Sequence, residues 1–217
     1  MTALYHVADR HPWGDKLLAE SAVKFYAVFD WQPMLSEMRL IKSPNEIRLM
    51  QQAGQITAFG HIKAMQVTRP NRFEYEIESE ILYEFNRHGA RFPSYNSIIA
   101  GGDNACILHY TENDQPLKDG DLVLIDAGCE FAMYAGDITR TFPVNGKFTQ
   151  PQREIYELVL KAQKRAIELL VPGNSIKLAN DEVIRIKTQG LVDLGILKGD
   201  VDKPVSYTHL TLPTKLE

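Results

Sequence analysis

Hydrophobic positions recur at helical spacing in the first clearly patterned part of the chain. Over residues 47–65, apolar side chains return every three or four positions, which predicts a helix with one buried face. Ser43, Pro44 and Glu46 are typical of a helix start, because serine caps, proline suits the first turn and glutamate completes a capping box. The segment 69–71, with a central proline, is expected to end this helix.

A second amphipathic helix is predicted directly afterwards. Its apolar stripe consists of Phe73, Ile77, Ile81 and Phe85. The glutamates of this segment fall opposite the stripe, and Asn71 with Glu74 is expected to form a second capping box. Gly89 is the expected stop, since glycine readily adopts the left-handed conformation that ends helices.

The pattern then changes to a period of two, which predicts strands at 97–100, 122–125 and 138–144. Two more helices are predicted after the strands, one opening at 149–152 and one over 174–194. The order of helices, strands and helices indicates an α+β fold.

Composition narrows the class of protein. The chain has 217 residues, 44% of them hydrophobic, and a net charge of −4, which is typical of a globular protein with its own core. No apolar run reaches the ~20 residues of a membrane span, and the mild negative charge gives no case for nucleic-acid binding. The N-terminus lacks a basic segment followed by an apolar one, so we expect a cytoplasmic protein without a signal peptide.

The cysteines and the helical histidines are assigned structural roles. Cys106 and Cys129 are too few and too far apart for a disulfide framework, and both are expected to be buried thiols. Cys129 could in principle bind a metal, but burial is the preferred interpretation. His61 and His88 fall in predicted helices and are expected at the surface or at helix ends.

Two aspartates carry the clearest chemical signal. Asp126 closes one apolar strand and Asp137 opens the next, although aspartate is disfavoured in strands. If the strands pair as a hairpin about the midpoint between Phe131 and Ala132, the two carboxylates lie opposite each other on one face. Such a pair repels unless a proton or a cation lies between them, and oxygen ligands favour Mn, Mg or Ca. The alternative is that both are turn or cap residues.

His109 and Tyr95 are weaker candidates on pattern alone. His109 lies among apolar residues ahead of the second strand, where a histidine is more often structural than functional. Tyr95 follows a Pro-Ser pair and has no periodic partner.

Five sequence runs nevertheless closely resemble one family. They are RLIKSPNEI (39–47), EFNRHGARFPSYN (84–96), CILHYTEN (106–113), LIDAGCE (124–130) and YAGDITRTFPVNGKFT (134–149). Together they resemble the bacterial Xaa-Pro aminopeptidases, or aminopeptidases P, of the pita-bread metallopeptidase family. The resemblance extends from about residue 30 to Asp202.

This resemblance implies both a fold and a reaction. The fold is the N-terminal half of a pita-bread domain, an antiparallel sheet with helices on one face. The reaction is metal-assisted removal of the first residue from peptides with proline in second position. The family site holds two ions, usually manganese, for which Asp126 and Asp137 match two ligands. His109 matches a catalytic residue that contacts substrate, Tyr95 matches a substrate-binding position, and Thr139 matches a threonine that orients the metal ligands.

The resemblance also implies that the chain is incomplete. Residues 1–38 correspond to a remnant of an N-terminal domain and linker, 39–202 to the first half of the catalytic domain, and 203–217 to a tail unlike the family. Three metal ligands are missing, so we expect an incomplete manganese site and an inactive fragment of an enzyme that forms homo-oligomers. Prolidase, another creatinase-family enzyme and a non-catalytic binding fragment remain the alternatives.

Overall fold

The computed structural model describes residues 31–198 and divides the chain into two units, Met1–Arg48 and Leu49–Glu217. In the first unit, α3 (Gln32–Leu40) has a proline in its first turn. The predicted capping box at the start of α4 (Pro44–Val67) is confirmed. The Ser43 N–H donates to Glu46 Oε2 at 2.7 Å, and the Glu46 N–H donates to Ser43 Oγ at 3.3 Å.

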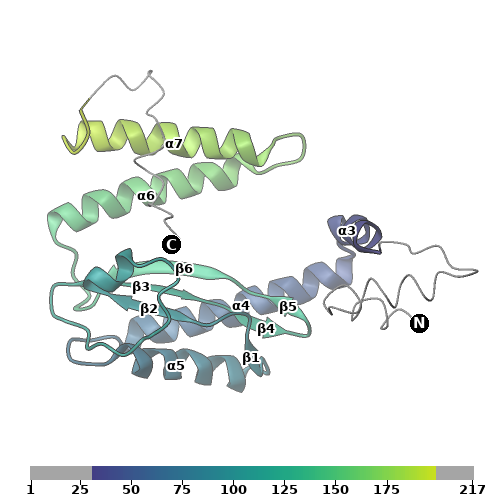
Figure 1. The fold of residues 1–217 in the computed structure, drawn as a ribbon, viewed down its shortest axis with the longest axis horizontal. Coiled ribbons are helices and arrows are strands. Elements are labelled where there is room, and N and C mark those ends of the chain that lie inside the picture. The colour runs from purple at the N-terminus through teal and green to yellow at the C-terminus, as the bar shows by residue number, and fades with distance from the viewer. Residues whose placement is uncertain (1–30, 199–217) are drawn as a thin grey trace, which may run out of the picture. The chain divides into compact units, whose positions relative to one another are not determined.

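The strands of the second unit form two small antiparallel sheets (Figure 1). The larger sheet has the order β2-β3-β6 and comprises Ile98–Gly101, Leu122–Ala127 and Ile138–Pro143. The smaller sheet has the order β1-β4-β5 and comprises Phe92–Pro93, Cys129–Phe131 and Tyr134–Ala135. The three predicted strands are therefore confirmed within a few residues, whereas the strands of the smaller sheet were not predicted.

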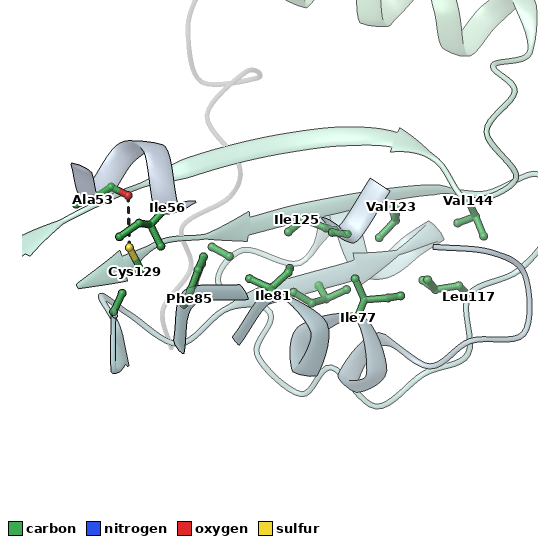
Figure 2. Close-up of a cluster of buried hydrophobic side chains, with 14 residues drawn as sticks. Ala53, Ile56, Ile77, Ile81, Phe85, Leu117, Val123, Ile125, Cys129 and Val144 are labelled. Carbon is green, nitrogen blue, oxygen red and sulfur yellow. Dashed lines mark hydrogen bonds between the residues drawn. The ribbon is translucent and has the colours of Figure 1, made fainter. Parts of the chain in front are cut away.

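One face of the larger sheet forms the core with α4 and α5 (Glu74–Arg87). Along β3, Val123, Ile125 and Ala127 are fully buried and alternate with half-buried residues, because successive side chains point to opposite faces. Figure 2 shows Val123 and Ile125 facing Ile77 and Ile81 of α5. Ala127 of β3, Phe85 of α5 and Ile56 of α4 belong to the same buried cluster. The predicted arrangement of helices on one face of an antiparallel sheet is confirmed.

The start of α5 differs from the prediction. Asn71 and Glu74 do not form the capping box; instead the Phe73 N–H donates to Glu76 Oε2 at 2.7 Å. Glu74 is the first residue of the helix and is fully buried, as Glu84 nearly is, so this face is not uniformly polar and exposed. Gly89, with φ of 89°, follows the end of the helix as predicted.

The last two helices pack against each other (Figure 1). α6 (Gln150–Leu169) begins with a capping box in which the Thr149 N–H donates to Gln152 Oε1 at 2.9 Å. Ser175 caps α7 (Ile176–Asp193). The two helices approach closely where Gly190 of α7 meets Leu158 of α6. No helix within residues 31–198 has the length and hydropathy needed to cross a membrane.

Three expectations about buried side chains are wrong and one is confirmed. Cys129 is buried, but Cys106 is exposed at the end of the 3-10 helix η1 (Gly102–Cys106). His61 is also buried rather than on the surface, because its ring faces the core side of β3 and bonds to the backbone there. The apolar stripe predicted over residues 47–65 is also not the buried face of α4, because Ile47, Met50, Ile62 and Met65 are exposed. The buried face consists of Ala53, Ile56, Thr57, Gly60, His61 and Ala64.

The buried imidazole of His61 predicts a pH-dependent stability. Its Nε2 lies 3.1 Å from the Ala127 carbonyl oxygen. Burial lowers the pKa of His61 below its ordinary value of 6.5, and Arg140 acts in the same direction. The unfolded chain therefore binds this proton more readily, so the free energy of unfolding should fall as the pH drops below 6.5, by up to about 1.4 kcal/mol per pH unit.

Urea unfolding at about pH 7.5 and about pH 5.5 measures this contribution. His61→Gln keeps a side-chain N–H donor and removes the titration, so the loss of stability between the two pH values should become smaller. An unchanged loss in the variant would contradict the assignment to His61.

Candidate metal and substrate site

The register of the hairpin places Asp126 differently from the prediction. Strand β3 pairs with β6 so that Asp126 lies opposite Thr139 rather than Asp137. The reason is the turn, which consists of Ala132 and Met133 with φ of 51° and 72°, the conformation of a tight two-residue hairpin turn. The centre of the hairpin thus lies between Ala132 and Met133, one residue beyond the predicted midpoint, and the partner of Asp126 moves by two positions. A shift of two keeps the same face.

The two aspartates nevertheless converge on one side chain. The Tyr95 hydroxyl lies 2.6 Å from Asp126 Oδ1 and 3.0 Å from Asp137 Oδ1, within hydrogen-bond distance of both. Asp126 is half-buried at the end of β3, whereas Asp137 is exposed just before β6. One phenolic proton therefore serves two carboxylates, and the cluster carries an excess of negative charge.

Backbone contacts of Ser94 hold Tyr95 in this position. The Ser94 N–H donates to the Gly128 carbonyl at 2.9 Å, and its hydroxyl donates to the Gly136 carbonyl at 2.8 Å. Gly128 follows Asp126 by two residues, and Gly136 directly precedes Asp137. Ser94 thus joins the two chain segments that carry the carboxylates, and its neighbour Tyr95 reaches both.

The environment of Tyr95 keeps its proton in place. Burial raises the pKa of Tyr95 well above its ordinary value, and the hydrogen bonds to Asp126 and Asp137 raise it further. The phenol therefore remains a hydrogen-bond donor throughout the neutral range.

The donor set fits a hard divalent cation. Two carboxylates that share one hydroxyl supply oxygen ligands, and neither forms an ion pair within residues 31–198, a situation in which a cation such as Mn, Mg or Ca is favoured. Within residues 31–198 no group of three or more His, Cys, Asp or Glu side chains is arranged to hold a metal ion. The described residues thus offer a pair of metal ligands rather than a full set.

Of the other predicted residues, Thr139 lies on the face of Asp126, whereas no contact among residues 31–198 places His109 there. Thr139 is exposed directly opposite Asp126. His109 is exposed and has a φ of 56°. The next residue, Tyr110, packs on Ile98 of β2, and Ile98 pairs with Asp126 on the side of β3 away from β6. Among the described residues, no hydrogen bond or ion pair links His109 to the aspartates, so the structure brings together Tyr95, Asp126 and Asp137 but not His109.

Sequence reasoning missed the residues that support this cluster. Ser94 was not singled out, and the short strand before it gives no periodic signal. The available signal was the pair of glycines, Gly128 and Gly136, placed just inside the two aspartates. A Cβ at Gly128 would overlap the backbone of Gly136, so these positions require the absence of a side chain.

Comparisons with known proteins identify the family. Residues 48–210 match metallopeptidase family M24. The Xaa-Pro aminopeptidase of Haemophilus influenzae is 88% identical over 202 residues, covering 93% of this chain and 47% of that protein. The Xaa-Pro aminopeptidase of Escherichia coli is 52% identical over 217 residues, covering 95% of this chain and 49% of its own length.

A solved structure supports the same assignment. Zinc-substituted E. coli aminopeptidase P in complex with product superposes with a TM-score of 0.79 at 62% identity, covering 80% of this chain and 40% of that one. The predicted pita-bread fold and the resemblance to Xaa-Pro aminopeptidases are thereby confirmed. The chain spans about half the length of the curated relatives it matches. The chain belongs to metallopeptidase family M24.

Proposed function

We propose that this chain is the part of an Xaa-Pro aminopeptidase that supplies two metal-binding carboxylates. The observation that carries the proposal is the convergence of Asp126 and Asp137 on the hydroxyl of Tyr95. The names of the two bacterial relatives supply the reaction, the removal of an N-terminal residue that precedes proline. Its substrate is accordingly a peptide with a free N-terminus and proline in second position.

Asp126 and Asp137 would hold the metal, which we propose to be a pair of manganese ions in the complete protein. The zinc-substituted relative supports a metal site in this fold. A divalent metal supplies polarisation of the peptide carbonyl and an activated water. Tyr95 keeps its proton and orients the two carboxylates, while Thr139 lies where its hydroxyl can support Asp126. His109 is proposed to contact the substrate.

Two alternatives differ in what they would cleave or bind. A prolidase would act on Xaa-Pro dipeptides only, and the names of the relatives favour the aminopeptidase. A non-catalytic binding fragment would leave the carboxylate pair without a chemical role. We also propose that the 217-residue chain by itself is inactive, because its described residues provide two carboxylates and no larger ligand cluster. The cytoplasmic location and the homo-oligomer stay predictions from the sequence.

A chimera tests the proposed function. In it, the segment of the H. influenzae relative that aligns with this chain is replaced by the corresponding residues of this chain; we call this protein the chimera. With manganese, it should release the first residue from an Xaa-Pro-Xaa tripeptide and leave an Xaa-Ala-Xaa control intact. The 217-residue chain alone should release nothing from either peptide.

Three results would contradict the proposal. Hydrolysis of dipeptides alone would indicate prolidase, and a folded chimera without activity would exclude the aminopeptidase. Manganese-dependent hydrolysis by the isolated chain would show that its site is complete. Circular dichroism and size-exclusion chromatography establish that the chimera is folded.

A further inference from the structure

Glu74 is a fully buried carboxylate that accepts four hydrogen bonds. Oε1 accepts from the Gly101 N–H at 2.8 Å and from Asn104 Nδ2 at 3.0 Å. Oε2 accepts from the Tyr110 hydroxyl at 2.7 Å and from the Gln115 N–H at 3.0 Å. Each carboxylate oxygen therefore has two donors, and the side chain has no exposed surface.

The four donors come from one segment of the chain, residues 101–115. Gly101 ends β2 where the segment begins, and Gln115 stands at its other end. Asn113, also buried, ties the segment to β2, because its Oδ1 accepts from the Ile99 N–H at 2.9 Å and its Nδ2 donates to the Ser97 carbonyl at 2.9 Å. The inner side of this loop is thus fixed at several points, with Glu74 at the centre.

The outer side of the same loop is exposed. Ile107 and Leu108 keep 55% and 60% of their surface accessible, and His109 adopts a left-handed backbone with φ of 56°. A left-handed backbone at a residue other than glycine persists only where the surroundings hold it. Tyr110, which follows His109 directly, is the link, because its ring packs on Ile98 beside the aspartate strand and its hydroxyl bonds to Glu74.

A buried carboxyl group in this position requires a reason beyond packing. Burying a carboxylate is costly unless its oxygens are hydrogen-bonded, and an apolar residue could fill the same space at the start of α5. No Lys, Arg or His forms an ion pair with Glu74 among residues 31–198, so the compensation comes from the donors of the loop. The carboxylate therefore specifies the conformation of the loop.

We propose that Glu74 is a positioning residue, which fixes the 101–115 loop through Tyr110 so that His109 is presented to the substrate on the face of Asp126. This inference rests on the proposed function, because it uses the substrate contact of His109. Glu74 lies at the start of α5, the helix that packs on the larger sheet, and does not itself touch the substrate.

Glu74→Gln in the chimera is the first test. The amide keeps the size of the side chain but places an NH₂ group opposite two donors, one of them a backbone N–H, so the loop must shift. We expect kcat/KM for the Xaa-Pro tripeptide to fall about tenfold or more, since small misplacements of a substrate-contacting group have effects of up to about 10²-fold. Glu112→Gln is the matched control, because Glu112 is an exposed carboxylate of the same loop, and it should leave kcat/KM unchanged.

A double-mutant cycle separates positioning from general stability. If Glu74 acts through His109, then Glu74→Gln combined with His109→Ala should be no worse than His109→Ala alone. Multiplied losses, or an unchanged kcat/KM in Glu74→Gln, would overturn the proposal. Should Glu74→Gln fail to fold, Tyr110→Phe takes its place in the same cycle, because it keeps the ring packing and removes one of the four donors.

Amide hydrogen exchange keeps this proposal separate from the proposed function. In Glu74→Gln, the backbone amides of residues 106–111 should exchange faster than in the parent, and in Glu112→Gln they should not. An inactive but folded parent chimera would overturn the proposed function and with it the substrate role of His109. Unchanged exchange in Glu74→Gln would overturn the positioning role whatever the activity of the parent.

Discussion

Asp126→Asn should lower kcat/KM of the chimera for an Xaa-Pro peptide by about 10³-fold, and Asp137→Asn should do the same. Metal-assisted polarisation and water activation each contribute several kcal/mol, and every 1.36 kcal/mol is tenfold in rate. Asparagine keeps the volume and the hydrogen bond with Tyr95 but loses the charge that favours a cation. The carboxylates converge on a single hydroxyl, so loss of either charge removes half of the ligand pair.

Manganese binding provides the second measurement for these variants. Titration calorimetry with Mn²⁺ should show weaker binding in Asp126→Asn than in the parent chimera. Asp103→Asn is the matched control, because Asp103 is an exposed carboxylate of η1 outside the cluster. Activity within a factor of two or so of the parent in Asp126→Asn would remove that carboxylate from the metal site.

The elements that were predicted well are those whose signals are local. Helix starts at Ser43 and Thr149 depend on a cap and a residue three positions later, both visible in the sequence. The long strand β3 alternates over six residues, enough to indicate its buried face. By contrast, β1 and β5 are two residues long, and no periodicity can be read from so short a segment.

Two of the errors share a different cause, since each depends on a partner far along the chain. Glu74 looked like a capping residue because its sequence neighbours fit that motif, but its donors lie 27 to 41 residues away. His61 looked exposed because the carbonyl that it meets is 66 residues away. A local pattern shows that a side chain is polar, but not whether the fold brings it a partner.

The candidate site shows the same division. The proximity of Asp126 and Asp137 followed from their spacing, but their predicted pairing was wrong by two positions, because the turn residues were not identified. The contribution of Tyr95 did not follow, because it depends on the tertiary contact that Ser94 makes with two glycine carbonyls. The resemblance to a known family supplied Tyr95 as a candidate where the residue pattern alone could not.

Gly128→Ala should unfold or severely destabilise the chain, by about 3 kcal/mol or more. A methyl group at this position would overlap the carbonyl of Gly136 and approach the Ser94 hydroxyl at 2.8 Å. Backbone atoms cannot move aside as a flexible side chain can, so the strands that carry Asp126 and Asp137 must separate. Ser94 would then lose its hydrogen bonds to both glycine carbonyls, and Tyr95 its position between the carboxylates.

Gly54→Ala is the matched control for this prediction. Gly54 lies within α4, and apart from the nearby backbone of the helix no heavy atom of residues 31–198 lies within 4 Å of the added methyl group. Alanine in a helix is favoured over glycine by about 0.5–1 kcal/mol, so this variant should be slightly more stable than the parent. Urea unfolding of the 217-residue chain, followed by circular dichroism, should therefore move the two midpoints in opposite directions. Equal midpoints for Gly128→Ala and the parent would show that the two strands do not approach each other as closely as this site requires.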